Sequence, residues 1–253
     1  AFFCIFAEKM TMIGLTGTKG KTSTAHMIKN ILEQAGHTVG MIGTVGAFIG
    51  SEKLDTKNTT PESYELHSLF DKMYRAGCSH VVMEVSSQGL KQQRTAGIRF
   101  HVGAFLNLSE DHIGDGEHAD FEEYKACKKL LLRQTDRMVI NIGAPYGEEF
   151  LAAAGNAVTV SATGDADLAA QNIRNIWDTE LFGVSFHAAG LFDHDLTVSM
   201  PGLFNVENAL VAAAVTNLCG IDPIIIDRGL RTVSIKGRTQ LIRASTHGAV
   251  VLI

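Results

Sequence analysis

The sequence predicts an α/β fold of three layers, in which a mostly parallel sheet lies between helices and carries a small antiparallel β insert. Two observations lead to this prediction. Short apolar segments rich in β-branched residues recur through about the first 150 residues, as in strands buried on both faces. Segments of helical periodicity lie between them, and this alternation produces a parallel sheet with helices on both sides.

The elements of this first part follow in a regular order. The predicted strands are residues 10–15, 38–45, 79–85, 102–108 and 137–142. The predicted helices are residues 21–35, 61–76 and 121–134. Pro61 suits the first position of its helix, because that position needs no backbone N–H partner.

The character of the chain changes between residues 155 and 200, where short alternating segments predict the antiparallel insert or a sheet edge. A helix of small residues follows over 204–220 and ends in a glycine cap, and a short helix covers 222–230. Residues 237–245 and 248–253 are predicted to be closing strands.

Composition excludes several classes of protein. The net charge of −5 argues against nucleic-acid binding, which normally requires a basic surface. Membrane insertion is not expected, because no apolar segment approaches the ~20 residues of a membrane span. The four scattered cysteines contain no CxxC pair, and we interpret them as reduced thiols of a cytoplasmic protein rather than a disulfide framework or zinc site. Residue 1 is not methionine, which suggests a piece of a longer protein.

Residues 14–32, GLTGTKGKTSTAHMIKNIL, join a predicted strand to a predicted helix through a glycine-rich loop. Backbone N–H groups of such a loop converge with the helix N-terminus on one point, which suits phosphates. Lys21 would reach the β- and γ-phosphates, and the Thr22 hydroxyl would bind Mg²⁺. Leu15 stands where the usual P-loop has its first glycine. The alternative is an ordinary tight turn with a solvated lysine. The predicted nucleotide-binding residues here are Gly17, Thr18, Lys19, Gly20, Lys21, Thr22 and Ser23.

The motif T-G-T-K-G-K-T over residues 16–22 resembles that of the Mur ligases, which are ATP-dependent amide-forming enzymes of cell-wall precursor synthesis. The resemblance extends over residues 10–243 and matches the central domain of the family. It implies an ATP-binding domain over 1–243 in a P-loop fold and the start of a C-terminal ligase domain over 244–253. The N-terminal UDP-binding domain of the family is missing from this sequence.

Glu84 ends a predicted strand, and ligands of open parallel sheets lie beyond the carboxyl ends of strands. The segment VVMEVSSQGL, residues 81–90, is similar to the family segment whose glutamate binds Mg²⁺. The resemblance therefore implies that Glu84 and Thr22 bind Mg²⁺. Without it, a glutamate at a strand end is more often a solvated surface charge.

Residues 107–132 contain an Asp-His pair and a long helix. They resemble the family stretch in which the histidine of the pair, here His112, binds a second Mg²⁺ and a later lysine is carbamylated. By position that lysine is Lys128, although the adjacent Lys129 leaves the register open. The resemblance gives Lys21, His112 and Lys128 catalytic roles. The alternatives are a hydrogen-bonded histidine and a solvated lysine.

Other segments resemble the substrate contacts of the ligases that add the third peptide residue. Residue by residue, this likeness implies contacts to a UDP-muramoyl dipeptide from Asn58, Thr59, Thr60, Ser86, Gln92 and Arg94. Gln88 departs from the histidine usual in the family. From spacing alone, Arg94 could equally be an exposed loop residue. The later segments resemble the family's nucleotide contacts and imply Asn205, Asn208 and Arg238.

The expected function is ATP-dependent addition of an amino acid, diaminopimelate or lysine, to UDP-N-acetylmuramoyl-L-Ala-D-Glu through an acyl phosphate in peptidoglycan synthesis. ATP and Mg²⁺ are the expected cofactors, and we expect a cytoplasmic monomer. One alternative is a folylpolyglutamate synthetase, which NTTPE and EVSSQGL disfavour. Another is a non-catalytic nucleotide-binding module. A P-loop GTPase lacks support, because no N-K-x-D segment is present.

Overall fold

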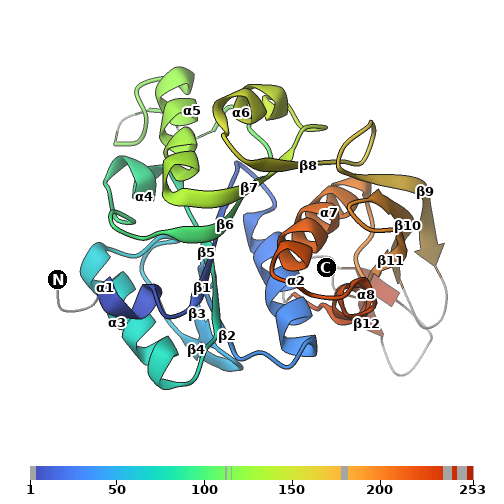
Figure 1. Cartoon of the computed structure of the whole chain (residues 1–253), viewed down its shortest axis with the longest axis horizontal. Coiled ribbons are helices and arrows are strands. Elements are labelled where there is room, and N and C mark those ends of the chain that lie inside the picture. Colours follow the sequence, from blue (N-terminus) through green and yellow to red (C-terminus); the bar gives the residue numbers. More distant parts are fainter. Residues whose placement is uncertain are drawn as a thin grey trace.

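The computed structural model describes residues 4–111, 113–114, 116–177, 182–235, 241–243 and 250–252, with side chains from residue 6 to residue 235. One sheet contains eleven strands in the order β11-β10-β9-β8-β7-β6-β1-β5-β2-β3-β4 (Figure 1). Its strands are β1 Thr11–Thr16, β2 Val39–Gly43, β3 Gly46–Ile49, β4 Glu52–Leu54, β5 His80–Glu84, β6 Phe100–Phe105, β7 Thr135–Asn141, β8 Ala157–Ser161, β9 Leu168–Trp177, β10 Phe182–Gly190 and β11 His194–Val198. A separate pair consists of β12 Leu241–Arg243 and β13 Val250–Leu252.

Helices cover both faces of this sheet (Figure 1). On one face lie α2 Lys21–Gln34, α7 Leu203–Leu218 and α8 Pro223–Thr232. The other face carries α1 Cys4–Ala7, α3 Ser63–Arg75, α4 Ser87–Lys91, α5 Phe121–Lys129 with the 3₁₀ turn η1 Leu130–Gln134, and α6 Gly147–Ala153. The three-layer α/β prediction is therefore confirmed.

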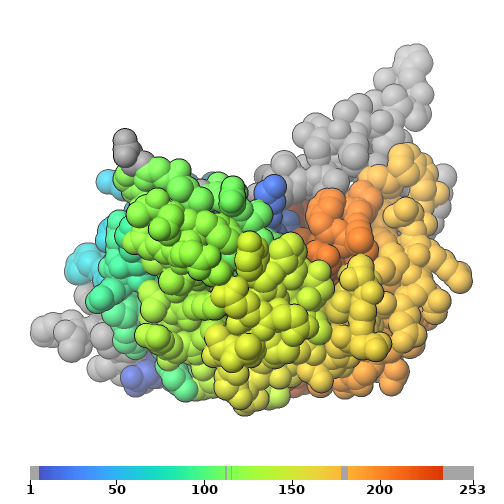
Figure 2. All heavy atoms as spheres, turned by 90° about the horizontal axis from the view of Figure 1, so that it is seen from above, coloured from blue at the N-terminus to red at the C-terminus, as the bar shows by residue number. Residues whose placement is uncertain are grey.

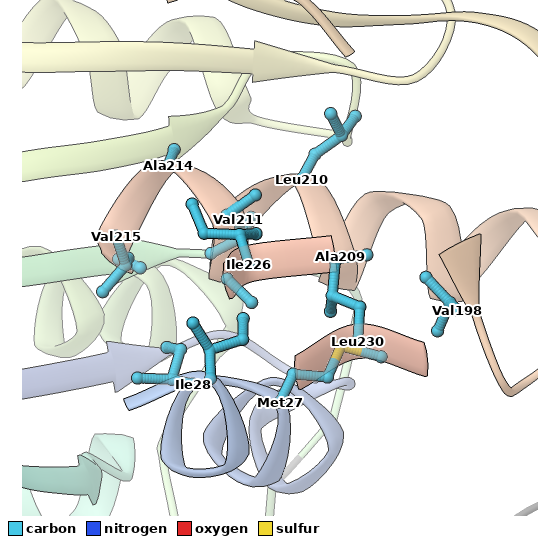
Figure 3. Packing of buried hydrophobic residues seen from close by; sticks show 14 of the residues in the cluster. Met27, Ile28, Val198, Ala209, Leu210, Val211, Ala214, Val215, Ile226 and Leu230 are labelled. Carbon is cyan, nitrogen blue, oxygen red and sulfur yellow. The ribbon is translucent and has the colours of Figure 1, made fainter. Parts of the chain in front are cut away.

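The largest part of the core lies between the sheet and the three helices α2, α7 and α8. Figure 3 shows Met27 and Ile28 of α2 close to Leu230 and Ile226 of α8 and to Val211 of α7. Helix α7 is buried almost all round, and its alanines let it approach α2 while it contacts strands β6 to β11. This packing fixes α7 beside the N-terminal end of α2.

Several predicted boundaries were wrong. Helix α3 begins at Ser63 after Glu62, so Pro61 is not its first residue. The cause is tertiary, because the Thr60 hydroxyl donates to the Glu84 carbonyl at 3.0 Å and holds this segment across the strand ends. The helix predicted over 121–134 becomes 3₁₀ from Leu130, which lets the chain enter β7 at Thr135.

The antiparallel part confirms one of the two alternatives that the sequence left open, a sheet edge. Strand β8 pairs in parallel with β7, and β9 with β8, so only β9, β10 and β11 form the antiparallel run. These strands extend the main sheet instead of forming a separate insert. A second antiparallel edge, β2-β3-β4, was not predicted. Of the predicted closing strands, only 241–243 and 250–252 lie among the described residues, and both are strands. Across the described part of the chain, none of the helices combines the length and apolar character that crossing a bilayer demands.

His80, at the start of β5, makes folding stability depend on pH. Its side chain is buried, and its ring lies 4.4 Å from the His37 ring between centroids. Burial, with smaller contributions from His37 and His101, lowers the pKa of His80 to about 4. The unfolded chain binds this proton near pH 6.5, whereas the folded chain does not until about pH 4.

We therefore expect the free energy of unfolding to fall by roughly 3 kcal/mol as pH drops from 6.5 to 4. Urea unfolding at several pH values measures this loss. His80→Gln should remove most of the dependence within that window. An unchanged pH profile in the variant would show that other groups cause it.

Candidate active site

The glycine-rich loop lies between β1 and α2, where the chain needs glycine twice. Gly17 has φ 155° and Gly20 has φ 86°. A Cβ on Gly17 would crowd Leu106 at 3.1 Å, and one on Gly20 would collide with the Asn208 amide of α7. The loop thus fits closely between β6 and α7, with the N-terminus of α2 at its end.

The segment after β6 holds this loop in place. The Thr18 N–H donates to the Asn107 carbonyl at 3.0 Å, and the Lys19 N–H donates to the Asn107 side-chain oxygen at 2.9 Å. The Asn107 amide returns a bond to the Lys19 carbonyl at 3.1 Å, and the Ser109 N–H donates to the Thr18 hydroxyl at 3.0 Å. These bonds hold the loop backbone in place, and N–H groups of this backbone would donate to phosphate oxygens.

A pocket of about 480 Å³ opens above the loop. Figure 2 shows that blue atoms of the early chain lie between green atoms of its middle and orange atoms of its later part. The pocket therefore combines residues far apart in the sequence. Its lining consists of Thr18, Lys19, Gly20, Lys21, Thr22, Ser23, Thr44, Glu84, Asn107, Phe204, Glu207 and Asn208.

Glu84 lies at the inner side of this pocket and is only 1% exposed. Its carboxylate accepts hydrogen bonds from the Thr22 hydroxyl at 3.1 Å and from both the N–H and the hydroxyl of Thr44 at 3.1 Å. A Cβ on Gly43 would overlap this carboxylate, so glycine at the end of β2 makes room for it. Glu84 is a buried acid directed at the glycine-rich loop, not a solvated surface charge.

Two lysines donate hydrogen bonds to backbone carbonyls of the loop. The Lys21 Nζ donates to the carbonyls of Gly17 at 2.7 Å and Thr18 at 3.1 Å. The Lys128 Nζ donates to the same Gly17 carbonyl at 2.9 Å and lies 4.4 Å from the centre of the Tyr124 ring. Lys128 is 2% exposed, and burial, reinforced by the nearby Lys21 charge, lowers its pKa to about 6. Its amine is thus mostly neutral at pH 7.

The two adjacent lysines of α5 have different surroundings. Lys129 points away from the loop and forms a salt bridge with Glu149 at 2.7 Å. Lys128 alone of the pair contacts the phosphate loop. The geometry therefore favours Lys128 in the register that the sequence left open.

A second polar cluster lies beside the pocket. The Ser86 N–H and hydroxyl donate to the Thr60 hydroxyl at 2.9 and 3.0 Å. Arg94 donates to the Thr60 carbonyl at 2.8 Å and pairs with Glu62 at 2.7 Å. The Arg94 side chain is 11% exposed, so it is not the exposed loop residue that spacing alone allowed.

The remaining predicted substrate residues lie around this cluster. The Thr59 hydroxyl is 3.1 Å from the Thr44 hydroxyl, which links the cluster to the pocket. Gln92 accepts a hydrogen bond from Arg94, and Asn58 is exposed. The structure thus brings the predicted substrate residues together at one side of Glu84.

The predicted residues of α7 occupy different depths. Asn208 lines the pocket and accepts a hydrogen bond from Thr24 at 3.3 Å. Asn205 lies outside the lining, where it donates to the Pro201 carbonyl at 2.8 Å. His112 and Arg238 lie outside the described residues.

Sequence reasoning missed four residues of the pocket lining: Thr44, Asn107, Phe204 and Glu207. Thr44 and Asn107 each follow a strand that ends at the same sheet edge as Glu84, and that position could have indicated them. Phe204 is 60% exposed at the pocket mouth, and Glu207 stands near it, where burial raises its pKa. Neither had a distinguishing sequence signal.

Comparisons with known proteins identify the family of this chain. Residues 15–216 match the Mur ligase middle domain. The chain is 38% identical to a UDP-N-acetylmuramoyl-L-alanyl-D-glutamate–2,6-diaminopimelate ligase of Clostridium acetobutylicum, over 95% of this chain and 49% of the relative. It is 40% identical to the ligase of the same name from Corynebacterium efficiens, over 93% and 45%. The chain thus spans about half the length of the curated relatives it matches.

Solved structures show the same fold. A structure of a UDP-N-acetylmuramoyl-L-alanyl-D-glutamate–2,6-diaminopimelate ligase superposes with a TM-score of 0.83 at 24% identity, over 93% of this chain and 49% of that one. A folylpolyglutamate synthase of Mycobacterium tuberculosis gives 0.77 at 18% identity, over 98% and 63%. Structural likeness at this identity extends to both kinds of enzyme, and it is the match to the middle-domain family over most of the sequence that shows this chain to be a member of the Mur ligase family.

Proposed function

We propose that this chain forms the ATP-binding part of a ligase that adds diaminopimelate to UDP-N-acetylmuramoyl-L-Ala-D-Glu. The observation that carries the proposal is the position of Glu84. Its carboxylate accepts from Thr22 of the phosphate loop, and its backbone carbonyl accepts from Thr60 of the second cluster. One residue therefore joins a pocket suited to nucleotide phosphates to a polar cluster suited to the acceptor. The names of the curated relatives support the choice of substrates.

The donor set beside the phosphate loop fits Mg²⁺. The hydroxyls of Thr22 and Thr44 both lie within hydrogen-bond distance of the Glu84 carboxylate. All are hard oxygen donors, which Mg²⁺ prefers, and they leave room for phosphate oxygens and water as further ligands. When bound, Mg²⁺ would neutralise charge on the β- and γ-phosphates.

Lys128 is suited to carbamylation, because a buried neutral amine is a nucleophile toward CO₂. The amine nitrogen bonds to the carbon of CO₂ and releases one proton, so that a neutral amine becomes an anion. This change would place a further carboxylate-like ligand beside the loop. A ¹³C-carbamate NMR signal from ¹³CO₂-treated protein should vanish in Lys128→Met and remain in Lys129→Met. A signal that survives in the first variant would remove Lys128 from this role.

The proposed reaction has two steps. The substrate carboxylate attacks the γ-phosphorus of ATP, and the bond to the bridging oxygen breaks, so that ADP leaves and an acyl phosphate forms. The amine of the incoming amino acid then attacks the acyl carbon, loses a proton and expels phosphate. Negative charge grows on the phosphoryl oxygens, where the loop N–H groups and Lys21 provide stabilisation. Arg94 is available to orient a carboxylate of the acceptor.

The test of this function uses the protein with all the sequence that flanks this chain in its natural gene. It is incubated with Mg·ATP, UDP-N-acetylmuramoyl-L-Ala-D-Glu and a panel of amino acids, and products are identified by mass spectrometry. We expect a tripeptide product with diaminopimelate. Lysine in its place would change the amino acid but keep the reaction class. Ligation of glutamate to a folate, or ATP binding without ligation, would overturn the proposal.

Glu84→Gln should weaken Mg²⁺ binding while it preserves the fold, because the amide oxygen can still accept from Thr44. We expect the Mg²⁺ concentration for half-maximal activity to rise about tenfold or more. Glu207→Gln, which changes another acid of the same pocket lining, is the matched control and should shift this Mg²⁺ concentration little. Equal shifts in both variants would point to a general electrostatic effect.

The free thiols Cys78, Cys127 and Cys219 are compatible with our proposal that the protein works in the cytoplasm. The monomeric state stays a prediction.

A further inference from the structure

His118, Glu123 and Cys127 form a compact cluster along α5 and the segment just before it. One ligand atom from each of these residues lies within 4.8 Å of those of the other two. Glu123 and Cys127 are one helical turn apart on the same side of α5, and His118 comes from the segment just before it. The phosphate pocket does not include these residues.

The histidine is oriented for metal binding. Its ring is fully buried, and its Nε2 is 2.9 Å from the Ser87 hydroxyl at the start of α4. Its Nδ1 faces the Glu123 carboxylate, 3.8 Å from Oε2. Metal-binding histidines are usually held in this way, with the second ring nitrogen on a neighbouring polar group.

The carboxylate is held from two sides. Glu123 Oε1 pairs with Lys91 at 2.9 Å, and Oε2 accepts from the Ala119 N–H at 2.7 Å. A carboxylate oxygen has a second lone pair, so Oε2 can also face a cation between itself and His118. The Glu123 side chain is 36% exposed, which gives an ion access from solvent, whereas Cys127 is 8% exposed.

From this arrangement the geometry points to a second metal site, for a divalent cation of the zinc class, built from His118, Glu123 and Cys127. Nitrogen, oxygen and sulfur donors of this kind are the usual ligands of zinc, and water completes the four. Zinc bonds of about 2.0–2.3 Å separate tetrahedral ligand atoms by roughly 3.3–3.8 Å, so small side-chain rotations close the present spacing. Binding requires the Cys127 thiol to lose its proton. Thiolate and carboxylate then neutralise the divalent cation, which makes the buried site tolerable.

Such a site would differ from the proposed Mg²⁺ site in the metals it selects. Thiolate and imidazole favour zinc and cobalt over magnesium, whereas the Glu84 and Thr22 oxygens favour magnesium. Occupancy would also join α5 to the segment before it, one residue from Lys128. The inference does not depend on which amino acid the enzyme adds.

The test is a Co²⁺ titration of the full-length protein in excess Mg²⁺, which fills oxygen-only sites. We expect one equivalent of Co²⁺ to produce the near-ultraviolet charge-transfer band of a cobalt–thiolate bond, and Zn²⁺ to displace it. Cys127→Ala should abolish the band. Ser87→Ala should keep the band but weaken Co²⁺ affinity by about 10–100-fold.

Cys78→Ala is the matched control, because Cys78 is also a buried free thiol. It should leave the band unchanged, and His118→Asn, which retains the thiol, should remove it if Cys127→Ala does not fold. Thermal unfolding gives a second measurement, since Zn²⁺ should raise the melting temperature of the wild type but not of Cys127→Ala. Absence of the band in the wild type, or its survival in folded Cys127→Ala, would overturn the site.

Discussion

Lys21→Ala should lower the rate of ATP-dependent ligation by about 10²–10³-fold, because we expect Lys21 to stabilise charge on the transferring phosphoryl group. The fold should survive, because Lys128 still donates to the Gly17 carbonyl that Lys21 also contacts. We expect the free energy of unfolding to change by no more than about 1 kcal/mol. Steady-state kinetics and urea unfolding of the same preparation measure both quantities.

Lys19→Ala is the control for this effect. Lys19 belongs to the same loop and carries the same charge, but its side chain is exposed. Its removal should lower the rate of ligation by about tenfold or less, since an exposed charge is screened by solvent. Equal losses in the two variants would mean that the loop acts through its overall charge and that Lys21 has no specific role.

Lys128→Met should make the protein more stable and nearly inactive. Methionine is similar in length and can pack against the Tyr124 ring, and it removes a desolvated amine. Lys21 still satisfies the Gly17 carbonyl. We expect the free energy of unfolding at pH 7 to rise by about 1–4 kcal/mol, because folding of the variant no longer forces an amine to lose its proton. Turnover should fall by about 10²-fold or more, because the group beside the transferring phosphate is lost.

The pH dependence identifies the cause of the added stability. The pKa of Lys128 is lowered from 10.5 to about 6 in the folded state, so the unfolded chain binds more protons between these values. Wild-type stability therefore rises with pH through this window, and the advantage of Lys128→Met should shrink from pH 7 to pH 9. Urea unfolding of both proteins in CO₂-free buffer at pH 7 and pH 9 measures this difference in stability.

Lys129→Met supplies the comparison for both readouts. It removes a partly exposed salt bridge with Glu149. We therefore expect the free energy of unfolding to fall by about 1 kcal/mol or less, and turnover to stay nearly normal. If Lys129→Met were the inactive variant, the assignment of α5 would be shifted by one residue.

Much of the fold could be predicted because its signals are local. Buried parallel strands such as β1 and β5 are continuous apolar segments, and the loop before α2 has its own glycine pattern. The helix start at Ser63 could not be predicted, since the bonds of Thr60 to Glu84 and Ser86 decide where the chain turns. The β3-β4 edge was missed because its strands are short and only partly buried.

The candidate site also combines features that could be predicted from the sequence with features that could not. The glycine-rich loop, the family and the position of Glu84 at a strand end could all be predicted from the sequence, because these depend on neighbouring residues and on the direction of parallel strands. Only the tertiary structure distinguished Lys128 from Lys129, because burial against Gly17 and Tyr124 sets the charge of an amine. The structure also shows that His118, Glu123 and Cys127, which are close in the sequence, turn toward one another, where the scattered cysteines had predicted no zinc site. The pKa of Lys128 depends on Gly17 and Lys21, which are distant in the chain, and only folding brings these groups together.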